Sequence, residues 1–469
     1  MIPVTIFAGR KVAVFGLGLS GLATAKALAA GGAEPALWDD GEKGREGARA
    51  AGFEPVDLTS ADWSQFAALV LAPGVPLTHP EPHWMVDRAK AAGVEIIGDT
   101  ELFCRQRRTE GSRAKIIAIT GTNGKSTTTA LAAHLIAASG RRAAMGGNIG
   151  TAVLALEPYA DDITYVLEYS SFQIDLTPSL DATAACLLNI TPDHLDRHGT
   201  LEHYAAVKAR IFDRLGADAT AVIGIDDPVS AAIADEVTGR ATLRRISVRG
   251  PVENGVYADG HSLIEVEAGN ARPAITLGGI GTLRGAHNAQ NAAAAFALCR
   301  AIGLSREEIA DGLASFPGLP HRMEEVGRLG RVLFINDSKA TNADAAAKAL
   351  ASFKPIYWIA GGLAKAGGLD GLETYFPNIA RAYFIGEAAG DFARAVDGAL
   401  QAQISGTLDA AIRDAARDAA SSDQPEPVVL LSPACASYDQ FPNFTVRGDA
   451  FRDGVAGLDG IVMRENAAG

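Results

Sequence analysis

Short apolar runs alternate along the chain with longer stretches of helical character. Residues 11–16, KVAVFG, form a compact run of β-branched and aromatic residues that ends at a glycine, which predicts a buried strand. The residues after this turn predict a helix over 20–31. Further apolar runs at 67–74 and 94–98 are separated by alanine-rich helical stretches. This alternation is typical of a parallel sheet with crossover helices.

The same order of strand, loop and helix begins twice more. The apolar run 116–119 leads into a glycine-containing loop, and the Ala/Leu-rich stretch after the loop has helical spacing. A third unit starts near residues 318–327. Its predicted strands are short apolar runs at 331–335, 355–360, 381–385 and 427–431. The chain therefore reads as three α/β units in series.

The polar stretch 104–115 lies between the first and second units and predicts a boundary segment. We therefore predict an α/β protein of three domains. These are a Rossmann-like domain at 1–99, a central P-loop ATPase-type domain with a mostly parallel sheet at 100–318, and a Rossmann-like domain at 319–469.

The charge balance restricts the class of partner. The chain has 469 residues and a net charge of −13, which argues against nucleic acid as a partner because such proteins display a basic face. A local cluster of lysines, arginines and backbone N–H groups can still bind a small anion on an acidic protein. The four cysteines form no C-x-x-C pair, which favours a reducing compartment and gives no zinc signature.

The stretch after Arg10 and Lys11 imitates a signal peptide, with an apolar core and small residues at its end. Its glycines at 16, 18 and 21 instead mark a strand, a tight turn and a helix. No run reaches the roughly 18 apolar residues that a membrane helix needs. We therefore expect a cytoplasmic protein without membrane insertion.

The segment AITGTNGKSTTTA, residues 118–130, resembles a phosphate-binding loop that lacks the first glycine of the usual G-x-x-x-x-G-K-[ST] pattern. Gly121 and Gly124 allow close backbone approach, so that N–H groups and the N-terminus of the following helix face an anionic polyphosphate. Lys125 adds a full positive charge, and the Ser126 hydroxyl can join a Mg²⁺ shell. A nucleotide site is favoured over a plain glycine turn.

Acidic and histidine side chains follow the next two apolar runs. Glu168 ends one run, where a carboxylate can bind a divalent ion beside the loop or can simply be an exposed strand end. NITPDHLDRH then crowds together Asp193, His194, Asp196 and His198. These residues could form a metal cluster, but the histidines could equally be surface or hydrogen-bonded core residues.

The N-terminal GLGLSG matches G-x-G-x-x-G, and Asp39 and Asp40 follow about twenty residues later. Taken alone, this pattern predicts a dinucleotide cofactor. The same turn can hold any pyrophosphate, including that of a nucleotide sugar. In the third unit, NDSKATN and the stretch 431–451 follow predicted strands. Their Lys339, Ser437 and Arg447 suit carboxylates or phosphates, although ordinary turn chemistry explains them as well.

Together these segments resemble the Mur ligases, the ATP-dependent amino-acid-adding enzymes of bacterial peptidoglycan synthesis. The resemblance covers nearly the whole chain and implies D-glutamate as the amino acid, UDP-N-acetylmuramoyl-L-alanine as its acceptor, and an acyl phosphate intermediate. It rests on GTNGKST, GGNIG, LEYSSFQ, NITPDHLDRH, GAHNAQN, GLPHRME, NDSKATN and SPACASYDQFPNF. By this resemblance the three domains bind the UDP-substrate, ATP and the amino acid, in that order.

The resemblance also implies roles for single residues. Lys125, Glu168, His194 and Lys208 would be catalytic, and Lys208 aligns with the lysine that family members carbamylate with CO₂. The resemblance implies ATP and two Mg²⁺ ions, and the implied metal ligands are Ser126, Glu168, His194 and carbamylated Lys208. The implied ATP-binding residues are Gly121, Thr122, Asn123, Gly124, Lys125, Ser126, Thr127, Asn291, Arg322 and Asp337.

Two further ligand sites follow from the same resemblance. The implied UDP-substrate residues are Gly18, Leu19, Ser20, Asp39, Gly74 and Asn148. The implied D-glutamate residues are Lys339, Thr341, Lys365, Ser437 and Phe444.

The chain departs from the family pattern at three places. Asp39-Asp40 stands where an Asp-Thr pair would hold the uracil, and the segment from His194 to Lys208 is about one residue short. GGLAKAGG, 361–368, replaces a Gly-Gly-Asp-Gly-Lys loop, with Lys365 as the natural counterpart of its lysine.

Other functions remain open at this point. The chain could be another Mur ligase or a folylpolyglutamate synthetase, which resembles it around the loop, although the N-terminal nucleotide-type domain argues against the latter. From other classes, GLGLSG could serve a nicotinamide-dependent dehydrogenase, or the chain could be a non-catalytic nucleotide-binding regulator. We expect a monomer whose partners are small-molecule substrates.

Overall fold

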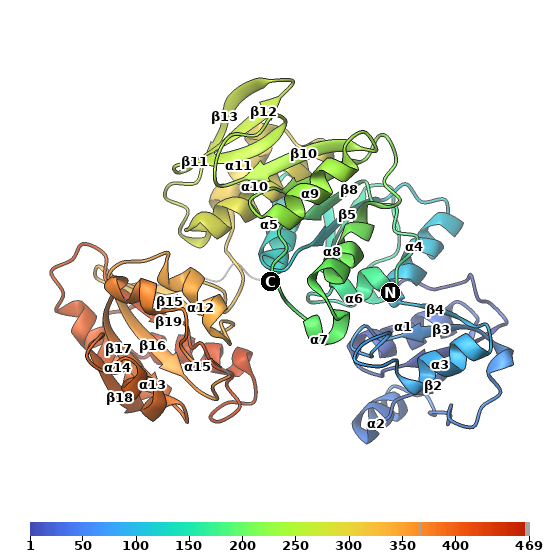
Figure 1. The fold of residues 1–469 in the computed structure, drawn as a ribbon, viewed down its shortest axis with the longest axis horizontal. Coiled ribbons are helices and arrows are strands. Elements are labelled where there is room, and N and C mark those ends of the chain that lie inside the picture. The colour runs from blue at the N-terminus through green and yellow to red at the C-terminus, as the bar shows by residue number, and fades with distance from the viewer. Residues whose placement is uncertain (366, 465–469) are drawn as a thin grey trace. The chain divides into compact units, whose positions relative to one another are not determined.

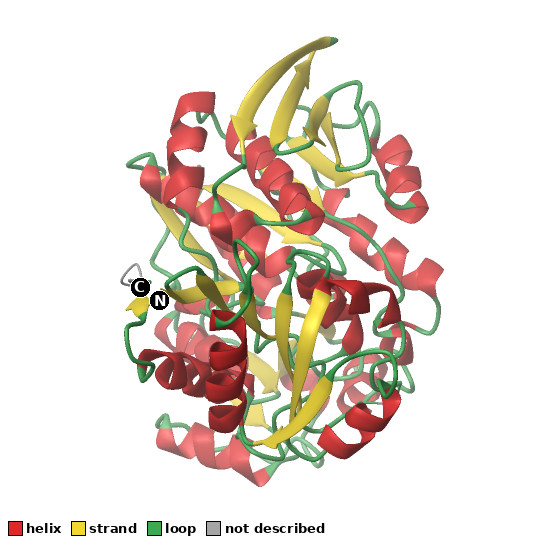
Figure 2. Cartoon of the chain, turned by 90° about the vertical axis from the view of Figure 1, so that its left-hand side faces the viewer, coloured by secondary structure: helices red, strands yellow, loops and turns green. Residues whose placement is uncertain are grey.

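The computed structural model describes residues 1–365 and 367–464, and its strands form three sheets (Figure 1). Residue 366 of the GGLAKAGG loop and residues 465–469 of the third predicted domain lie outside the described residues. Helices cover the faces of the sheets (Figure 2), as expected for strands joined by crossover helices. The predicted α/β class is confirmed.

The chain divides into two compact units, the first formed by residues 1–278 and 288–315 and the second by 279–287 and 316–469. The first unit contains two of the sheets. A hydrogen bond connects the N-terminus with the region of the central sheet, where Ile2 N donates to Leu154 O over 2.9 Å. The predicted boundaries after residues 99 and 318 stay predictions.

The N-terminal sheet has four parallel strands in the order β2-β1-β3-β4. Alternate residues of β1 enter different cores: Val12 and Val14 pack in one cluster, and Ala13 and Phe15 in another. Both faces of the strand are thus buried, which explains its unbroken apolar run. The elements are β1 (Lys11–Phe15), α1 (Leu19–Ala30), β2 (Glu34–Trp38), α2 (Glu42–Ala50), η1 (Trp63–Gln65), β3 (Phe66–Leu71), α3 (Trp84–Ala91) and β4 (Glu95–Ile97).

The predicted boundary segment 104–115 is wrong over its first half, because residues 104–109 belong to the helix α4 (Asp99–Thr109). The polar residues of this stretch belong to a helix that also has a buried apolar side. Leu102 and Phe103 are fully buried, while the Arg105 guanidinium pairs with Glu101 one turn earlier.

The central sheet has nine strands in the order β13-β12-β11-β10-β9-β8-β5-β7-β6. The strands from β6 to β11 are parallel, and β12 and β13 add an antiparallel edge. The elements are β5 (Lys115–Thr120), α5 (Lys125–Ala138), β6 (Arg142–Gly147), η2 (Val153–Ala155), β7 (Ile163–Glu168), α6 (Ser171–Asp175), β8 (Ala184–Leu187), α7 (Leu195–His198), α8 (Leu201–Ala209), η3 (Arg210–Phe212), β9 (Thr220–Gly224), α9 (Pro228–Val237), β10 (Thr242–Ser247), β11 (Gly255–Asp259), β12 (Ser262–Glu267), β13 (Asn270–Thr276), α10 (Ala286–Ala301) and α11 (Arg306–Ser315).

The third sheet has seven strands in the order β18-β17-β16-β19-β15-β14-β20. Its four predicted strands are confirmed as β15, β16, β17 and β19, which are parallel to one another, whereas β14 runs antiparallel to β15. The elements of this unit are η4 (Gly281–Leu283), β14 (Glu324–Leu329), β15 (Val332–Asn336), α12 (Ala343–Leu350), β16 (Ile356–Gly361), η5 (Glu373–Asn378), β17 (Ile379–Ile385), α13 (Ala389–Ala395), β18 (Ala402–Gly406), α14 (Leu408–Ala420), β19 (Val428–Leu431), α15 (Phe444–Ala456) and β20 (Val462–Met463).

The described residues contain no helix that is both long enough and apolar enough to span a membrane. The loops at the carboxyl ends of parallel strands are the usual ligand sites of such sheets. GLGLSG follows β1, GTNGKST follows β5 and NDSKATN continues from the last residue of β15. The fold therefore places each candidate motif where a ligand can reach it.

Candidate active site

The glycine-containing loop 121–124 joins β5 to α5 in the order that the sequence predicts. Its two glycines have positive φ, +150° at Gly121 and +87° at Gly124. Neighbouring backbone and side chains fix the loop: Thr122 N donates to Asn189 O over 2.8 Å, and Asn123 N donates to Asn189 Oδ1 over 2.9 Å. The loop is thus held from the start of NITPDHLDRH, one strand away.

Gly124 lies against the side chain of Asn291, which α10 contributes. A Cβ at Gly124 would overlap Asn291 Oδ1 and lie 3.2 Å from the Leu188 Cδ1. The same Oδ1 accepts a 3.3 Å hydrogen bond from Thr128 Oγ1, and Asn291 Nδ2 donates to Asn288 Oδ1 over 3.1 Å. The structure therefore brings two predicted ATP residues that are far apart in the chain, Gly124 and Asn291, into contact, and glycine is required at 124.

Lys125 is the first residue of α5, and its side chain turns back over the loop. Its Nζ donates to the carbonyl oxygens of Gly121 and Thr122 over 2.9 and 2.8 Å. Ser126 and Thr127 follow in the first turn of this 14-residue helix, where backbone N–H groups lack intrahelical partners. The arrangement concentrates positive charge and N–H donors at one point, which suits a polyphosphate.

Glu168 is a buried carboxylate with one oxygen lacking a partner. It ends β7, in register with Ile119 of β5 and with Gly147 of β6. Its Oε1 accepts a 2.7 Å hydrogen bond from Asn148 Nδ2, whereas its buried Oε2 accepts none from the described residues. A buried carboxylate oxygen without a hydrogen bond is costly, so this atom suits a cation. Asn148 holds the carboxylate in place.

Lys208 reaches the same loop from the last turn of α8. Its side chain is 1% exposed, and its Nζ donates to Gly121 O over 2.9 Å and to Thr120 Oγ1 over 3.2 Å. Burial, together with the nearby charge of Lys125, holds the pKa of the Lys208 amine well below its usual range, although Asp193 and Glu168 oppose this. The neutral amine is a nucleophile, whereas the ammonium is not.

The histidines of NITPDHLDRH take different roles. His194 is half exposed, has φ of +51° and packs edge-on against Phe172. His198 is buried, stacks on the same Phe172 ring and shares a 2.8 Å hydrogen bond with Ser171 Oγ. Burial lowers the pKa of His198 to about 4. His198 is therefore the hydrogen-bonded core residue that the sequence left open.

The acidic residues of that segment do not complete a metal cluster by themselves. Among residues 1–365 and 367–464, no group of three or more His, Cys, Asp and Glu side chains is arranged to hold a metal ion. Asp193 contacts His194 at 3.5 Å. Any ion at Glu168 therefore needs further ligands, such as a hydroxyl group, the substrate, water or a modified side chain.

The GLGLSG turn is packed tightly at its first and last glycines and open at the middle one. A Cβ at Gly16 would lie 2.5 Å from the Ala72 Cβ, and one at Gly21 would overlap Gly16 O. Gly18 has open space around its Cα, and Leu19 is 85% exposed. Ser20 Oγ donates to Asp99 Oδ2 over 2.5 Å. The exposed part of the turn is Gly18-Leu19.

The two aspartates after β2 already have partners. Asp39 accepts hydrogen bonds from Leu17 N and Gly41 N over 2.7 and 2.8 Å. Asp40 Oδ2 lies 3.0 Å from His83 Nε2. Asp39 thus stabilises the GLGLSG turn itself, while Asp40 faces the loop before α3. Gly74, another predicted substrate residue, accepts a 2.9 Å hydrogen bond from Arg197 through its carbonyl oxygen.

In the second unit, the loops after β15 and β19 meet. Asp337 is buried, and its Oδ2 accepts a 2.8 Å hydrogen bond from Ser432 Oγ. Burial raises the pKa of Asp337 to about 7. Lys339 Nζ lies 3.9 Å from the centroid of the Phe444 ring, so two predicted D-glutamate residues are in contact.

The other predicted residues of this unit surround these loops. Arg322 lies next to His321, whose backbone carbonyl accepts a 3.0 Å hydrogen bond from Lys339 N. Ser437 is buried, and Lys365 is exposed in the loop after β16. Thr341 follows Lys339 in NDSKATN, and Thr341 N donates to Lys339 O over 2.9 Å.

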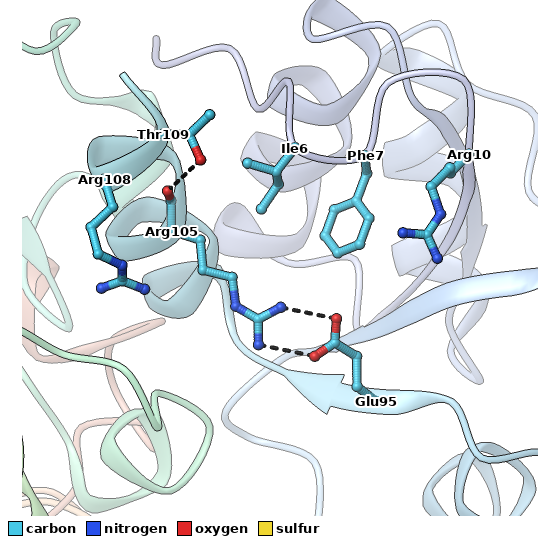
Figure 3. A pocket seen from close by; sticks show the side chains of 7 residues that line it. All are labelled: Ile6, Phe7, Arg10, Glu95, Arg105, Arg108 and Thr109. Carbon is cyan, nitrogen blue, oxygen red and sulfur yellow. Dashed lines mark hydrogen bonds and ion pairs between the residues drawn. The ribbon is translucent and has the colours of Figure 1, made fainter. Parts of the chain in front are cut away.

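A separate hollow of about 360 Å³ lies away from these loops (Figure 3). It borders Arg10, just before β1, and Glu95, the first residue of β4, and therefore lies at the amino ends of the strands. The Arg105 guanidinium spans it with two 2.9 Å hydrogen bonds to Glu95. We therefore do not include this hollow in the candidate site.

Sequence reasoning missed Asn189 and Ser338 as loop-fixing residues. Asn189 holds the backbone of the phosphate loop, and its Nδ2 donates to Gln290 Oε1 over 2.9 Å. Ser338 Oγ donates to Phe444 O over 2.8 Å. Both residues lie within the motifs NITPDHLDRH and NDSKATN, but only the fold shows which backbone atoms their side chains reach.

Comparison with known proteins gives a consistent result. A model of the Mur ligase middle domain matches residues 119–299, and a model of the Mur ligase glutamate ligase domain matches residues 321–435. UDP-N-acetylmuramoylalanine--D-glutamate ligase of Chelativorans sp. (strain BNC1) is 60% identical, covering 99% of this chain and 99% of the relative. The enzyme of the same name from Rhizobium meliloti (strain 1021) is 58% identical, covering 99% of this chain and 100% of the relative.

A solved structure supports the fold. UDP-N-acetylmuramate-alanine ligase MurC from Thermotoga maritima aligns with a TM-score of 0.56 at 16% identity, covering 95% of this chain and 98% of that chain. At this identity the likeness concerns the fold alone. The full-length relatives near 60% identity decide the family: the chain belongs to the Mur ligases.

Proposed function

We propose that the chain joins D-glutamate to UDP-N-acetylmuramoyl-L-alanine in peptidoglycan precursor synthesis, with ATP converted to ADP and phosphate. The observation that carries the choice of substrates is the 60% identity over 99% of both chains with a relative named for that reaction. The fold places the buried carboxylate of Glu168, which has one oxygen without a hydrogen bond, near the candidate phosphate loop, and this arrangement suits an ATP-dependent ligase.

The chemistry needs an activated carboxylate. A carboxylate is a poor acyl donor because its oxygen is a poor leaving group, so the γ-phosphoryl group of ATP is first transferred to it. Phosphoryl transfer is helped by positioning and by neutralisation of charge. Lys125 and the N–H groups at the start of α5 supply both at the loop. The D-glutamate amine then attacks the acyl phosphate, and a tetrahedral intermediate collapses to the amide and phosphate.

Mg²⁺ fits the residues around the loop. The unpartnered Oε2 of Glu168 and the Ser126 hydroxyl are hard oxygen ligands of the kind that Mg²⁺ prefers, and His194 is the further implied ligand. When bound, Mg²⁺ offsets the charge that develops on the transferring phosphoryl group. We propose two such ions, as the family resemblance implies.

Lys208 is suited to carbamylation. Burial lowers the pKa of its amine, which lies beside the loop carbonyl of Gly121, and so favours the neutral form; a neutral amine attacks CO₂ to form an N–C bond with loss of one proton. The product is an anionic oxygen ligand in place of an ammonium. Such an oxygen could share a cation with Glu168, whose charge already couples to the Lys208 amine.

A pair of lysine substitutions tests this assignment. Lys208→Ala should lose activity and regain part of it when a short carboxylate such as formate is added, because the added anion replaces the lost oxygens. Lys115→Ala is the matched control, since Lys115 lies at the other end of β5 and its Nζ donates to the backbone oxygen of Ile302. Full activity of unaided Lys208→Ala would contradict the carbamate.

The N-terminal turn is the proposed substrate anchor. Gly18 and Leu19 are the exposed part of GLGLSG, and the α1 N-terminus behind them suits the pyrophosphate of a UDP-sugar. Ser20, Asp39, Gly74 and Asn148 complete the proposed set. Because Asp39 already binds Leu17 N and Gly41 N, we assign it to shaping the turn, and its role toward uracil would be through the backbone that it holds.

The proposed D-glutamate residues combine charge and shape. Lys339 and Lys365 offer positive charge to the two carboxylates of the amino acid, while Thr341, Ser437 and Phe444 orient it. The contact of Lys339 with the Phe444 ring supports this grouping. Asn291, Arg322 and Asp337 are the proposed contacts of the adenine and ribose of ATP.

The decisive assay is phosphate release from ATP with UDP-N-acetylmuramoyl-L-alanine and Mg²⁺, comparing D-glutamate, L-glutamate, other amino acids and none. Release only with D-glutamate supports the proposal. Release with another amino acid would keep the family and change the substrate. No release with any amino acid would favour the non-catalytic regulator or the dehydrogenase instead, and a nicotinamide absorbance change would identify the dehydrogenase. Sedimentation of the purified chain tests the proposed monomer, and fractionation of cells tests its proposed place in the cytoplasm.

A further inference from the structure

Arg447 is a fully buried arginine that binds only neutral groups. It lies in the first turn of α15 and is 1% exposed. Its Nε donates to Ser338 Oγ over 3.0 Å, and its Nη2 donates to Ser338 O and Cys435 O over 2.9 and 3.0 Å. Within the described residues its guanidinium donates to no carboxylate and its Nη1 has no acceptor, so Asp439 acts on its charge only at longer range. Burying a cation without a directly bonded counter-charge is costly, so this position needs a reason.

The guanidinium lies where three loops meet. Ser338 belongs to the loop after β15, and Cys435 to the loop after β19. The third loop follows β16: a Cβ built on Gly362 would lie 3.2 Å from Arg447 Nη1. These strands are neighbours, because β19 pairs with both β16 and β15. The arginine therefore hydrogen-bonds to two of the loops and lies close to the third at the carboxyl edge of the sheet.

The loops are also joined directly. Leu363 N donates to Ala436 O over 2.9 Å, and Ala436 N donates to Leu363 O over 3.0 Å, so residues 363 and 436 form an isolated antiparallel bridge. A Cβ at Gly362 would overlap Ala436 O, so only glycine lets the two loops approach this closely. Arg447 links the loop of Ser338 to this pair of loops, because its guanidinium donates to both Ser338 and Cys435.

These loops carry the proposed amino-acid residues. Lys339 directly follows Ser338, Ser437 lies two residues after Cys435, and Lys365 lies three residues after Gly362. Ser338 Oγ, which accepts from Arg447, in turn donates to the backbone oxygen of Phe444. A shift of any one loop would change the spacing between these charges.

We propose that Arg447 is a positioning residue of the D-glutamate site, whose guanidinium holds the loops after β15, β16 and β19 in register. This inference rests on the proposed function, since it assumes that these loops bind D-glutamate. The planar fork of arginine donates to Ser338 and Cys435 at once, whereas a lysine ammonium on a flexible stem cannot hold both in one plane. The orphaned Nη1 and the close approach of Gly362 leave no space for a larger group there.

The test compares Arg447→Lys with Arg381→Lys. Arg381 belongs to the same compact unit, pairs with Asp418 over 3.0 Å and lies near the start of β17, away from the three loops. For Arg447→Lys we expect the KM for D-glutamate to rise about tenfold, the effect of losing one or two hydrogen bonds to a positioning group. The KM values for ATP and for UDP-N-acetylmuramoyl-L-alanine should change by less than about twofold. Arg381→Lys should leave all three KM values unchanged.

A purely structural role gives a different pattern. If Arg447→Lys lowers Tm but leaves the KM for D-glutamate unchanged, or raises all three KM values equally, the inference is wrong. If Arg447→Lys does not fold, Ser338→Ala removes one acceptor of the guanidinium and should still raise the KM for D-glutamate selectively. Failure of the proposed function is recognised separately, because the unmodified chain would then release no phosphate in response to D-glutamate.

Discussion

Replacing Gly124 by alanine should damage the phosphate loop through one contact that can be isolated. The residue has φ of +87°, which a residue with a Cβ adopts at a cost of about 1–2 kcal/mol. The new Cβ would also overlap Asn291 Oδ1, so the Asn291 amide must move. Its hydrogen bonds with Thr128 and Asn288 would then weaken, at about 0.5–1.5 kcal/mol each.

These contributions predict that Gly124→Ala lowers the free energy of unfolding by about 2–5 kcal/mol. Gly140→Ala is the matched control, because Gly140 lies just after α5, has φ of +77° and has open space around a built Cβ. It should cost only the backbone part, about 1–2 kcal/mol. The difference between the two variants measures the contact with Asn291.

Urea unfolding followed by circular dichroism gives the stability of both variants, and steady-state phosphate release gives the KM for ATP. We expect Gly124→Ala to raise the KM for ATP at least tenfold and Gly140→Ala to leave it unchanged. Equal losses of stability, with an unchanged KM for ATP in both variants, would refute the reasoning about this loop.

Three further predictions concern buried titratable groups. Glu168→Gln should reduce turnover at least a hundredfold at any Mg²⁺ concentration. It should leave Tm equal or higher, because it removes a buried carboxylate oxygen that has no hydrogen bond. Turnover near that of the unchanged chain would argue against a metal role. The pKa of His198 is lowered to about 4, against an ordinary 6.5, so the unfolded chain binds the proton at a higher pH than the folded chain does. The free energy of unfolding should therefore be highest above pH 6.5 and fall by about 3 kcal/mol as the pH drops to 4. His198→Phe should abolish this pH dependence in urea titrations, and an identical slope in both proteins would contradict it. The pKa of Asp337 is raised to about 7, so its effect on stability has the opposite pH dependence. The free energy of unfolding should be highest below pH 4 and fall as the pH rises to 7, because the unfolded chain loses this proton first. Asp337→Asn should therefore be more stable than the unchanged chain, by up to about 4 kcal/mol at pH 8. Calorimetry at pH 5 and pH 8 checks this, and a constant difference between the two proteins would refute it.

The sequence predicts the regular elements of this fold well, because its central strands are buried on both faces. KVAVFG and the runs around β15, β16 and β19 are continuous apolar segments for this reason, and their bounds agree with the structure to within one residue or two. The helix α4 was missed at 104–109, because polar residues dominate this stretch and their partners lie elsewhere in the chain. Arg108 Nη1, for example, donates to Ser179 O over 2.7 Å.

The candidate site divides in the same way. Local spacing was enough to predict the strand, loop and helix of the candidate phosphate loop, since they follow one another in the chain. Side-chain partners were not predictable from spacing. Asp39 binds the backbone of Leu17, and Arg447, which looks suited to an anion, is buried among carbonyl and hydroxyl oxygens. Such contacts depend on which loops the sheet order brings together.

The central claim is that a carboxylate oxygen of the substrate, and not water, accepts the γ-phosphoryl group of ATP. The most direct measurement uses UDP-N-acetylmuramoyl-L-alanine with ¹⁸O in its terminal carboxylate, incubated with ATP, Mg²⁺ and D-glutamate. Mass spectrometry of the released phosphate should find one ¹⁸O atom in each molecule, because the acyl phosphate passes a carboxylate oxygen to phosphate when the amide forms. Phosphate that carries no label would contradict the account.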